Sequence, residues 1–168
     1  MTMHHRLRRG VGLLALLGVI GAATGQVPSP LLDSPPLTTL AGQPLSPGAW
    51  PGAATVVVFW SVDCAYCQRH NSRIAQLHAT VDPQRLKVLG VAEGGDAAAA
   101  RQEAARRDWR FPMVIDDGRL RARFTPRRVV PMTCLLAADG RLAQCIPGEM
   151  SEADVMALAS VPWSGSAR

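Results

Sequence analysis

The chain has 168 residues, of which 48% are hydrophobic and 18% charged, a composition that excludes an intrinsically disordered protein. Its formal net charge is +5, but Arg6, Arg8 and Arg9 lie at the N-terminus; without residues 1–25, 15 basic and 13 acidic residues remain, a net charge of +2. The remaining arginines are interrupted by acidic residues and lack interleaved aromatic residues, which disfavours nucleic-acid binding.

The first 25 residues have the pattern of an export signal. Residues 1–9 are basic, residues 10–23 are uncharged and apolar, and residues 23–25 are small enough for a cleavage site. The apolar run is shorter than the roughly 20 residues of a spanning helix, which favours a cleaved signal and leaves an uncleaved membrane anchor as the alternative. We therefore expect the rest of the chain in the periplasm, where its four cysteines can form disulfides.

The mature chain has the length of one domain. Four prolines in residues 26–36 predict an extended tether, and turn residues between short apolar pieces predict a small hairpin within residues 37–50. We expect the domain to cover residues 37–162, followed by a C-terminal tail at residues 163–168.

The remaining elements alternate between strand and helix patterns. Residues 55–60 form a continuous β-branched and aromatic run, typical of a strand buried on both faces. After Cys64 the apolar residues recur every three or four positions, which predicts a helix that ends before Pro83. We expect further strands at residues 86–92 and 111–115, helices at 96–109, 119–124 and 151–159, and a hairpin with arms at 132–137 and 141–146. This order predicts an α/β fold in which helices flank a central mixed sheet.

A CxxC motif lies between the first buried strand and the helix that follows it. Cys64 lies at the start of this helix, where unpaired amides and the helix dipole stabilise a thiolate, so we expect it to be the attacking sulfur. Cys67 begins the apolar face of the helix and is expected to be the shielded, resolving sulfur. A structural disulfide, half of a zinc site, and a copper site with His70 are the alternatives, although His70 is expected to be solvated.

These segments together resemble the TlpA/ResA-like extracytoplasmic thioredoxin-fold proteins. The resemblance covers roughly residues 37–160 and is carried by the segments 56–67, 88–93, 111–116, 130–133 and 139–142. It implies a thioredoxin fold and a thiol-disulfide oxidoreductase that needs no cofactor. It also implies a client protein with a disulfide or thiols, and a membrane thiol-reductant supplier of the DsbD/CcdA type.

The resemblance also assigns residues around the dithiol. It implies that Pro131 is a cis-proline facing the CxxC motif and that the backbone of Val130 pairs with an extended substrate. Glu93 matches an acidic residue that helps to deprotonate the resolving cysteine, with an ordinary solvated glutamate as the alternative. Tyr66, expected to be exposed, and Trp60 are further candidates for substrate contact.

Two features depart from the simplest expectation. Asp63 precedes Cys64, and a neighbouring carboxylate opposes thiolate formation. Cys134 and Cys145 lie on the two arms of the predicted hairpin. A two-residue turn at Asp139 and Gly140 would place them opposite each other, whereas a three-residue turn that includes Ala138 would pair Cys134 with Gln144. We favour the longer turn and predict two free, buried cysteines.

The sequence and its resemblance together predict a monomeric, extracytoplasmic thiol-disulfide oxidoreductase that reduces client disulfides. The resemblance suggests as clients apocytochrome c, in cytochrome c biogenesis, or copper-site apoproteins. One alternative is a disulfide oxidase or isomerase that uses the same two cysteines. The other is a copper-binding chaperone.

Overall fold

A computed structural model describes residues 28–46, 48 and 50–161 of the chain. The predicted export signal and the C-terminal tail lie outside these residues. Among the residues described, no helix combines the length and the apolar character that crossing a membrane requires.

The centre of the fold is a five-stranded mixed sheet with the strand order β5-β4-β3-β6-β7. Strands β3 (Ala54–Trp60), β4 (Leu86–Glu93) and β5 (Met113–Asp116) are parallel to one another. Strand β6 (Met132–Leu136) pairs antiparallel with β3, and β7 (Leu142–Pro147) pairs antiparallel with β6. All seven residues of β3 are buried, which confirms the prediction of a central strand covered on both faces.

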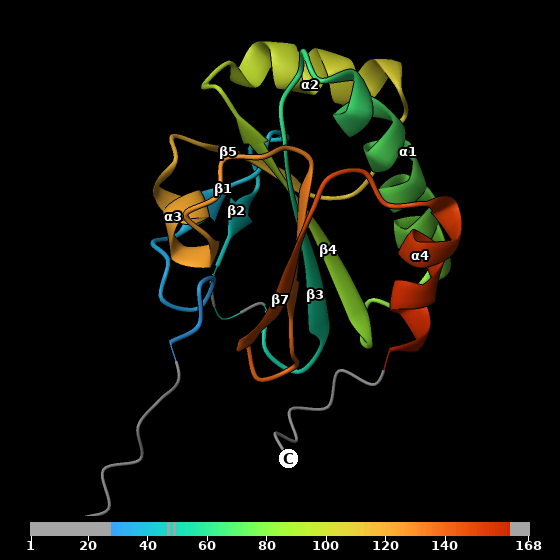
Figure 1. Cartoon of the computed structure of the whole chain (residues 1–168). Coiled ribbons are helices and arrows are strands. Elements are labelled where there is room, and N and C mark those ends of the chain that lie inside the picture. Colours follow the sequence, from blue (N-terminus) through green and yellow to red (C-terminus); the bar gives the residue numbers. More distant parts are fainter. Residues whose placement is uncertain (1–27, 47, 49, 162–168) are drawn as a thin grey trace, which may run out of the picture.

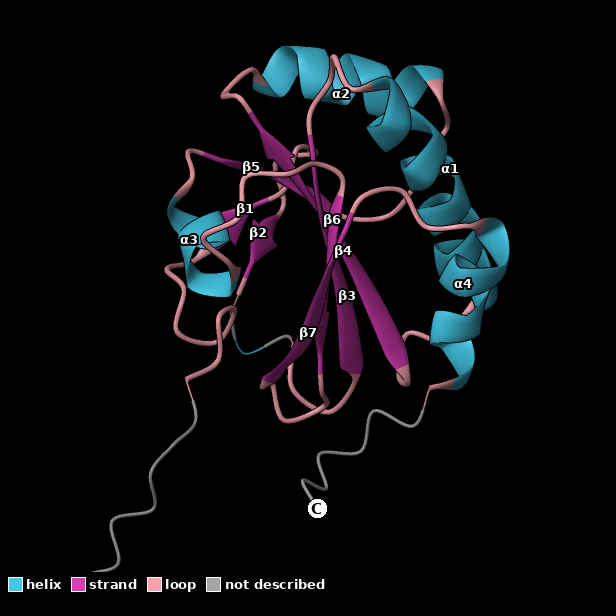
Figure 2. Ribbon diagram, viewed as in Figure 1, coloured by secondary structure: helices cyan, strands magenta, loops and turns pink. Residues whose placement is uncertain are grey.

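Helices cover the two faces of the sheet unequally (Figures 1 and 2). The helices α1 (Ala65–Thr80), α2 (Ala97–Arg106) and α4 (Glu152–Ala157) pack against one face, and a 3-10 turn (Leu158–Ser160) follows α4. The short helix α3 (Arg119–Phe124) packs against the other face.

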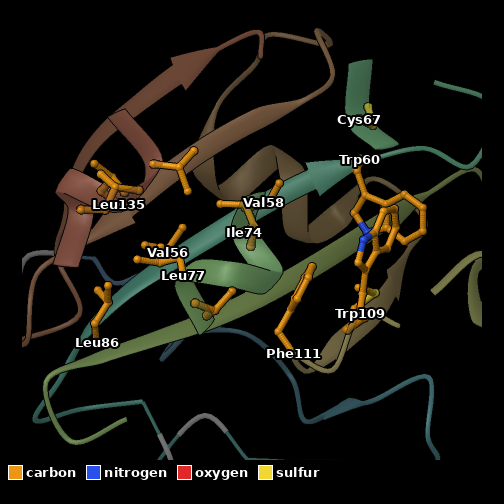
Figure 3. Close-up of a cluster of buried hydrophobic side chains, with 14 of the residues drawn as sticks. Val56, Val58, Trp60, Cys67, Ile74, Leu77, Leu86, Trp109, Phe111 and Leu135 are labelled. Atoms are coloured by element: carbon orange, nitrogen blue, oxygen red, sulfur yellow. The ribbon is translucent and has the colours of Figure 1, made fainter. Parts of the chain in front are cut away.

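Each face of the sheet has its own hydrophobic core. Figure 3 shows the first core, on the face covered by α1, in which Val56 and Val58 of β3 meet Ile74 and Leu77 of α1. Successive β3 residues point to opposite faces, so Val57 and Phe59 belong to the second core.

The predicted N-terminal hairpin consists of two very short strands, β1 (Leu37–Thr38) and β2 (Pro44–Leu45). The backbone N–H of Leu40 donates to the carbonyl of Met113 at 2.7 Å, which attaches the hairpin to the free edge of β5. This arrangement confirms a thioredoxin fold with a small N-terminal extension.

The segment expected to be an extended tether is instead folded onto the domain within residues 28–36. Leu31 is fully buried in the core beneath α3, and residues 30–33 form a turn. The Ser29 hydroxyl donates to the carbonyl of Gly140 at 2.7 Å, in the turn between β6 and β7. The prolines indicated an extended, exposed segment. The burial of Leu31 against distant core residues favours the folded turn, and the proline pattern does not predict that contact.

The prediction of free cysteines in the last hairpin was wrong, because Cys134 and Cys145 form a disulfide with a Cα–Cα distance of 4.1 Å. The three-residue turn is present, since Ala137 bonds to Arg141 across it. Ala143 then adds a bulge: Leu136 pairs with Leu142, but Leu135 pairs with Gln144. This second irregularity shifts the register back by one residue and places Cys134 opposite Cys145.

Candidate active site

The two cysteines of the CxxC motif form a disulfide at the N-terminus of α1, with a Cα–Cα distance of 5.1 Å. Cys64 is the N-cap residue, and its sulfur accepts a hydrogen bond from the backbone N–H of Cys67 at 3.1 Å. Cys64 is half-buried, whereas Cys67 is fully buried and lies in the first core. In the reduced protein the same amide and the helix dipole would stabilise a thiolate on Cys64, the sulfur that a second molecule can reach.

The loop before β6 faces this disulfide. The peptide bond between Val130 and Pro131 is cis, as the sequence resemblance implied. The Val130 carbonyl oxygen lies 3.9 Å from the Cys64 sulfur, so the backbone of the loop borders the reactive atom. The Pro131 carbonyl accepts a hydrogen bond from the backbone N–H of Gly148 at 2.8 Å, which ties the loop to the residue after β7.

Two large exposed side chains lie close in sequence to the groups that face each other at this site. Tyr66, within the CxxC motif, is 62% exposed, and Val129, directly before Val130, is 50% exposed. Tyr66 also carries the guanidinium of Arg69 over its ring at 4.8 Å. The expected exposure of Tyr66 is confirmed.

The position of Trp60 does not fit the expected direct contact with a substrate. Its side chain is fully buried and packs edge-to-face on Trp109, with ring centroids 5.4 Å apart (Figure 3). It is the last residue of β3, so it packs in the hydrophobic core directly before the segment that carries the CxxC motif.

Glu93 is the last residue of β4. Because Trp60, the last residue of β3, pairs with Ala92, Glu93 lies at the same end of the parallel strands as the start of the segment that carries the dithiol. Its carboxylate is partly buried and accepts a hydrogen bond from Arg121 at 3.1 Å. Desolvation by burial raises the pKa of Glu93, and the positive charge of Arg121 opposes this increase. A raised pKa makes this carboxylate a stronger base than an exposed glutamate.

His70 is fully buried, although the sequence analysis expected it to be solvated. Its Nδ1 accepts a hydrogen bond from the backbone N–H of Met150 at 3.3 Å, and its Nε2 lies 2.9 Å from the Thr133 hydroxyl. Burial lowers the pKa of His70 to about 4, so its ring is neutral at pH 7. Both ring nitrogens are engaged within the protein, so His70 offers no free ligand beside the dithiol.

Arg121 is a residue near the site that the sequence analysis missed. It is one of several arginines in residues 119–128, and nothing in its spacing distinguishes it from the others. In the structure it is fully buried, and it bonds to Glu93 and to the backbone of the loop before Pro131.

Residues 31–143 match the AhpC/TSA family, and the chain belongs to this family. Over 119 residues the sequence is 26% identical to the thiol-disulfide oxidoreductase ResA of Geobacillus kaustophilus (strain HTA426), covering 71% of this chain and 68% of that protein.

Solved structures share the fold. A secreted Mycobacterium tuberculosis disulfide oxidoreductase homologous to E. coli DsbE matches with a TM-score of 0.68 and 22% identity, covering 77% of this chain and 96% of that chain. A thiol:disulfide interchange protein of the thioredoxin family from Chlorobium tepidum TLS matches with a TM-score of 0.70 and 20% identity, covering 79% and 95%. StoA from Bacillus subtilis matches with a TM-score of 0.63 and 18% identity, covering 72% and 92%.

The family, the fold and the Cys64–Cys67 disulfide together define a thiol-disulfide oxidoreductase of the thioredoxin fold. This result agrees with the TlpA/ResA-like resemblance of the sequence.

Proposed function

We propose that the protein works outside the cytoplasm and reduces disulfides in client proteins. The observation that carries the proposal is the placement of Cys64, half-buried at the start of α1 and 3.9 Å from the Val130 carbonyl. A client chain that pairs with the Val130 backbone would bring its own disulfide to the Cys64 sulfur.

The reaction starts from the dithiol form of the protein. The Cys64 thiolate attacks one sulfur of the client disulfide, which forms a mixed disulfide and releases the other client sulfur as a thiolate. Cys67 loses its proton and attacks the Cys64 sulfur, which releases the second client sulfur and forms the Cys64–Cys67 disulfide. The client gains two electrons, two protons complete its thiols, and the oxidised protein is the form that the structure describes.

We assign to Glu93 the role of the base that helps Cys67 to lose its proton. Glu93 ends β4 beside the C-terminal end of β3, the strand that leads into the dithiol, and burial raises its pKa. Its carboxylate would receive the proton directly or through water. Val130, Pro131 and Tyr66 would border the bound client.

The finer assignments rest on the TlpA/ResA-like resemblance. A membrane thiol-reductant supplier of the DsbD/CcdA type would return the protein to its dithiol form. Apocytochrome c and copper-site apoproteins are the proposed clients, which would place the protein in cytochrome c biogenesis or copper-site assembly. A periplasmic location, as a monomer with a cleaved signal or an N-terminal anchor, fits these partners.

The direct test is reduction of insulin disulfides by the purified domain. We expect Cys64→Ser to abolish the reaction, because it removes the attacking sulfur. Cys67→Ser should instead accumulate a mixed disulfide between Cys64 and insulin, visible by non-reducing electrophoresis and mass spectrometry. Insulin reduction that is unchanged in Cys64→Ser would refute the proposal.

The copper-chaperone alternative loses its third ligand, because both nitrogens of His70 are engaged by Thr133 and Met150. Titration of the reduced protein with Cu(I) tests this directly. Tight binding that is lost in His70→Ala would favour the chaperone over the reductase. The oxidase or isomerase alternative uses the same residues and differs from the reductase in its reduction potential.

A further inference from the structure

Arg121 connects two parts of the site that come from different elements. It lies on α3, with its side chain 1% exposed and its guanidinium 4.9 Å above the ring of Phe59. Its Nη2 donates to the Val129 carbonyl at 2.6 Å, and Nε and Nη2 both donate to the Arg127 carbonyl, at 2.9 and 2.6 Å. Its Nη1 donates to Glu93 on β4 at 3.1 Å.

The two carbonyls that accept hydrogen bonds from Arg121, those of Arg127 and Val129, lie within the three residues before Val130. Val129 is adjacent to Val130, whose own carbonyl lies 3.9 Å from the Cys64 sulfur. A buried guanidinium with several acceptors in fixed directions restricts the backbone that carries those acceptors. Arg121 therefore limits the shapes that the loop 127–130 can adopt.

We propose that Arg121 is a positioning residue that holds the client-binding backbone at residues 127–130 and sets the charge state of Glu93. The second half of this inference rests on the proposed function, in which Glu93 is the base. The positioning of the loop requires only that client proteins bind at residues 127–130.

The charges around the pair define its electrostatics. Arg121 and Arg128 face Glu93 and favour its ionised form, whereas Asp116 on β5 opposes ionisation. The carboxylate of Asp116 is itself held by the backbone N–H groups of Leu120 and Arg121, at 3.0 and 2.9 Å. Removing the charge of Arg121 should raise the pKa of Glu93 further, whereas replacing the guanidinium with an ammonium should leave it near the wild-type value.

The test separates these two effects with two substitutions. Arg121→Lys keeps the charge and loses the forked set of donors, whereas Arg121→Met loses both. Arg119→Lys and Arg119→Met are the matched controls, because Arg119 lies on the same helix but is 90% exposed and pairs with Asp117. Thermal unfolding verifies that each variant is folded.

Insulin and 2,2′-dithiodipyridine are the two substrates, because the second is a neutral disulfide without a peptide backbone. We expect Arg121→Lys to raise the KM for insulin about tenfold, the scale of a lost charged hydrogen bond, with kcat changed less than about twofold. The rate with 2,2′-dithiodipyridine should be unchanged. An unchanged KM for insulin, or equal slowing with both substrates, would overturn the positioning of the loop.

NMR titration of the Glu93 side-chain carboxyl measures the second effect without any turnover. We expect its pKa to rise by about one unit in Arg121→Met and to stay near the wild-type value in Arg121→Lys and in both Arg119 controls. If Arg121→Met does not fold, Arg121→Gln supplies the same neutral comparison. An unchanged Glu93 pKa in the neutral variant would overturn the assignment, even if insulin reduction itself is confirmed.

Discussion

His70 is a neutral imidazole inside the protein, three residues after Cys67 on the helix that carries the dithiol. Since its Nδ1 accepts from Met150, its proton resides on Nε2, which donates to the Thr133 hydroxyl. Thr133 is the second residue of β6, directly after the cis-proline loop. One side chain therefore ties α1 to the strand that follows the loop.

Acid should destabilise the protein through His70. Its pKa is about 4 in the folded protein, against 6.5 for an unperturbed histidine, so only the unfolded chain binds a proton between these values. The stabilisation is complete above pH 6.5 and is lost as the pH falls toward 4. Arg73 lowers this pKa and Glu149 raises it, but burial is the largest effect.

We expect the free energy of unfolding in urea to fall by roughly 3 kcal/mol between pH 7 and pH 4 from this group alone. His70→Gln, which keeps an acceptor and a donor, should lose most of this dependence. His78→Gln is the control, because His78 is only partly buried against Phe111. Equal pH dependence in wild type and His70→Gln would contradict this account.

At the level of elements, the hairpin of β6 and β7 is joined at its middle by the Cys134–Cys145 disulfide. Cys134 is fully buried under α3, and Cys145 is half-buried on the edge strand β7. The bridge fastens β7 to the strand that begins directly after Pro131. Its position, away from α1, indicates a structural role that is separate from the Cys64–Cys67 pair.

Replacing both Cys134 and Cys145 with Ala should lower the free energy of unfolding by about 3 kcal/mol, because the bridge closes a loop of about a dozen residues in the unfolded chain. Insulin reduction by the folded double variant should remain near the wild-type rate. Mass spectrometry of the unreduced wild-type protein should find peptides that link Cys134 to Cys145. Free thiols at both positions would contradict the structure.

The turn of this hairpin also supports the N-terminal segment. Gly140 has a φ of +83°, and a Cβ atom there would lie 2.6 Å from the Ser29 hydroxyl oxygen and 2.9 Å from Leu32. The turn at residues 30–33 therefore packs closely against a position that only glycine fits.

Gly140→Ala should destabilise the protein by about 2 kcal/mol, since it combines backbone strain with the displacement of Ser29 and Leu32. Gly42→Ala is the control, because Gly42 has a φ of +81° but no atom within 4 Å of an added Cβ. The difference in thermal unfolding between the two variants measures the contact alone. Equal effects would show that residues 29–34 do not pack on this turn.

The hairpin also shows where sequence patterns fail. Asp139 and Gly140 predict the turn, because Asp-Gly is a preferred hairpin pair and glycine readily adopts a positive φ. The bulge at Ala143 has no comparable signal, since alanine fits bulged and regular strands alike, yet it decides whether Cys134 meets Cys145. A register error of one residue reverses the faces of all later side chains, so the disulfide was missed although the turn was predicted.

At the scale of the whole molecule, the order of elements and the dithiol could be predicted because their signals are local. Buried strands such as residues 55–60 and the start of α1 at Cys64 depend on neighbouring residues only. The burial of His70, Arg121 and Leu31 depends on partners that are distant in sequence, such as Thr133, Glu93 and Phe59. These contacts form only in the folded protein, where the sheet places the separate elements side by side, so local sequence patterns do not predict them.

The fold brings these parts together at the C-terminal ends of the parallel strands β3 and β4. Strand β3 and α1 supply the dithiol, β4 supplies Glu93, α3 supplies Arg121, and the loop before β6 supplies the backbone beside Cys64. This assembly is suited to thiol-disulfide exchange in either direction, so the direction of electron flow is the central claim to test.

The reduction potential of the Cys64–Cys67 couple tests that claim most directly. It is measured by equilibration with glutathione or dithiothreitol buffers, in the Cys134→Ala, Cys145→Ala double variant, so that only one couple titrates. A reductase fed by a membrane donor predicts a value near that of thioredoxin, about −270 mV. A value near that of DsbA, about −120 mV, would make the protein an oxidant and contradict the proposed function.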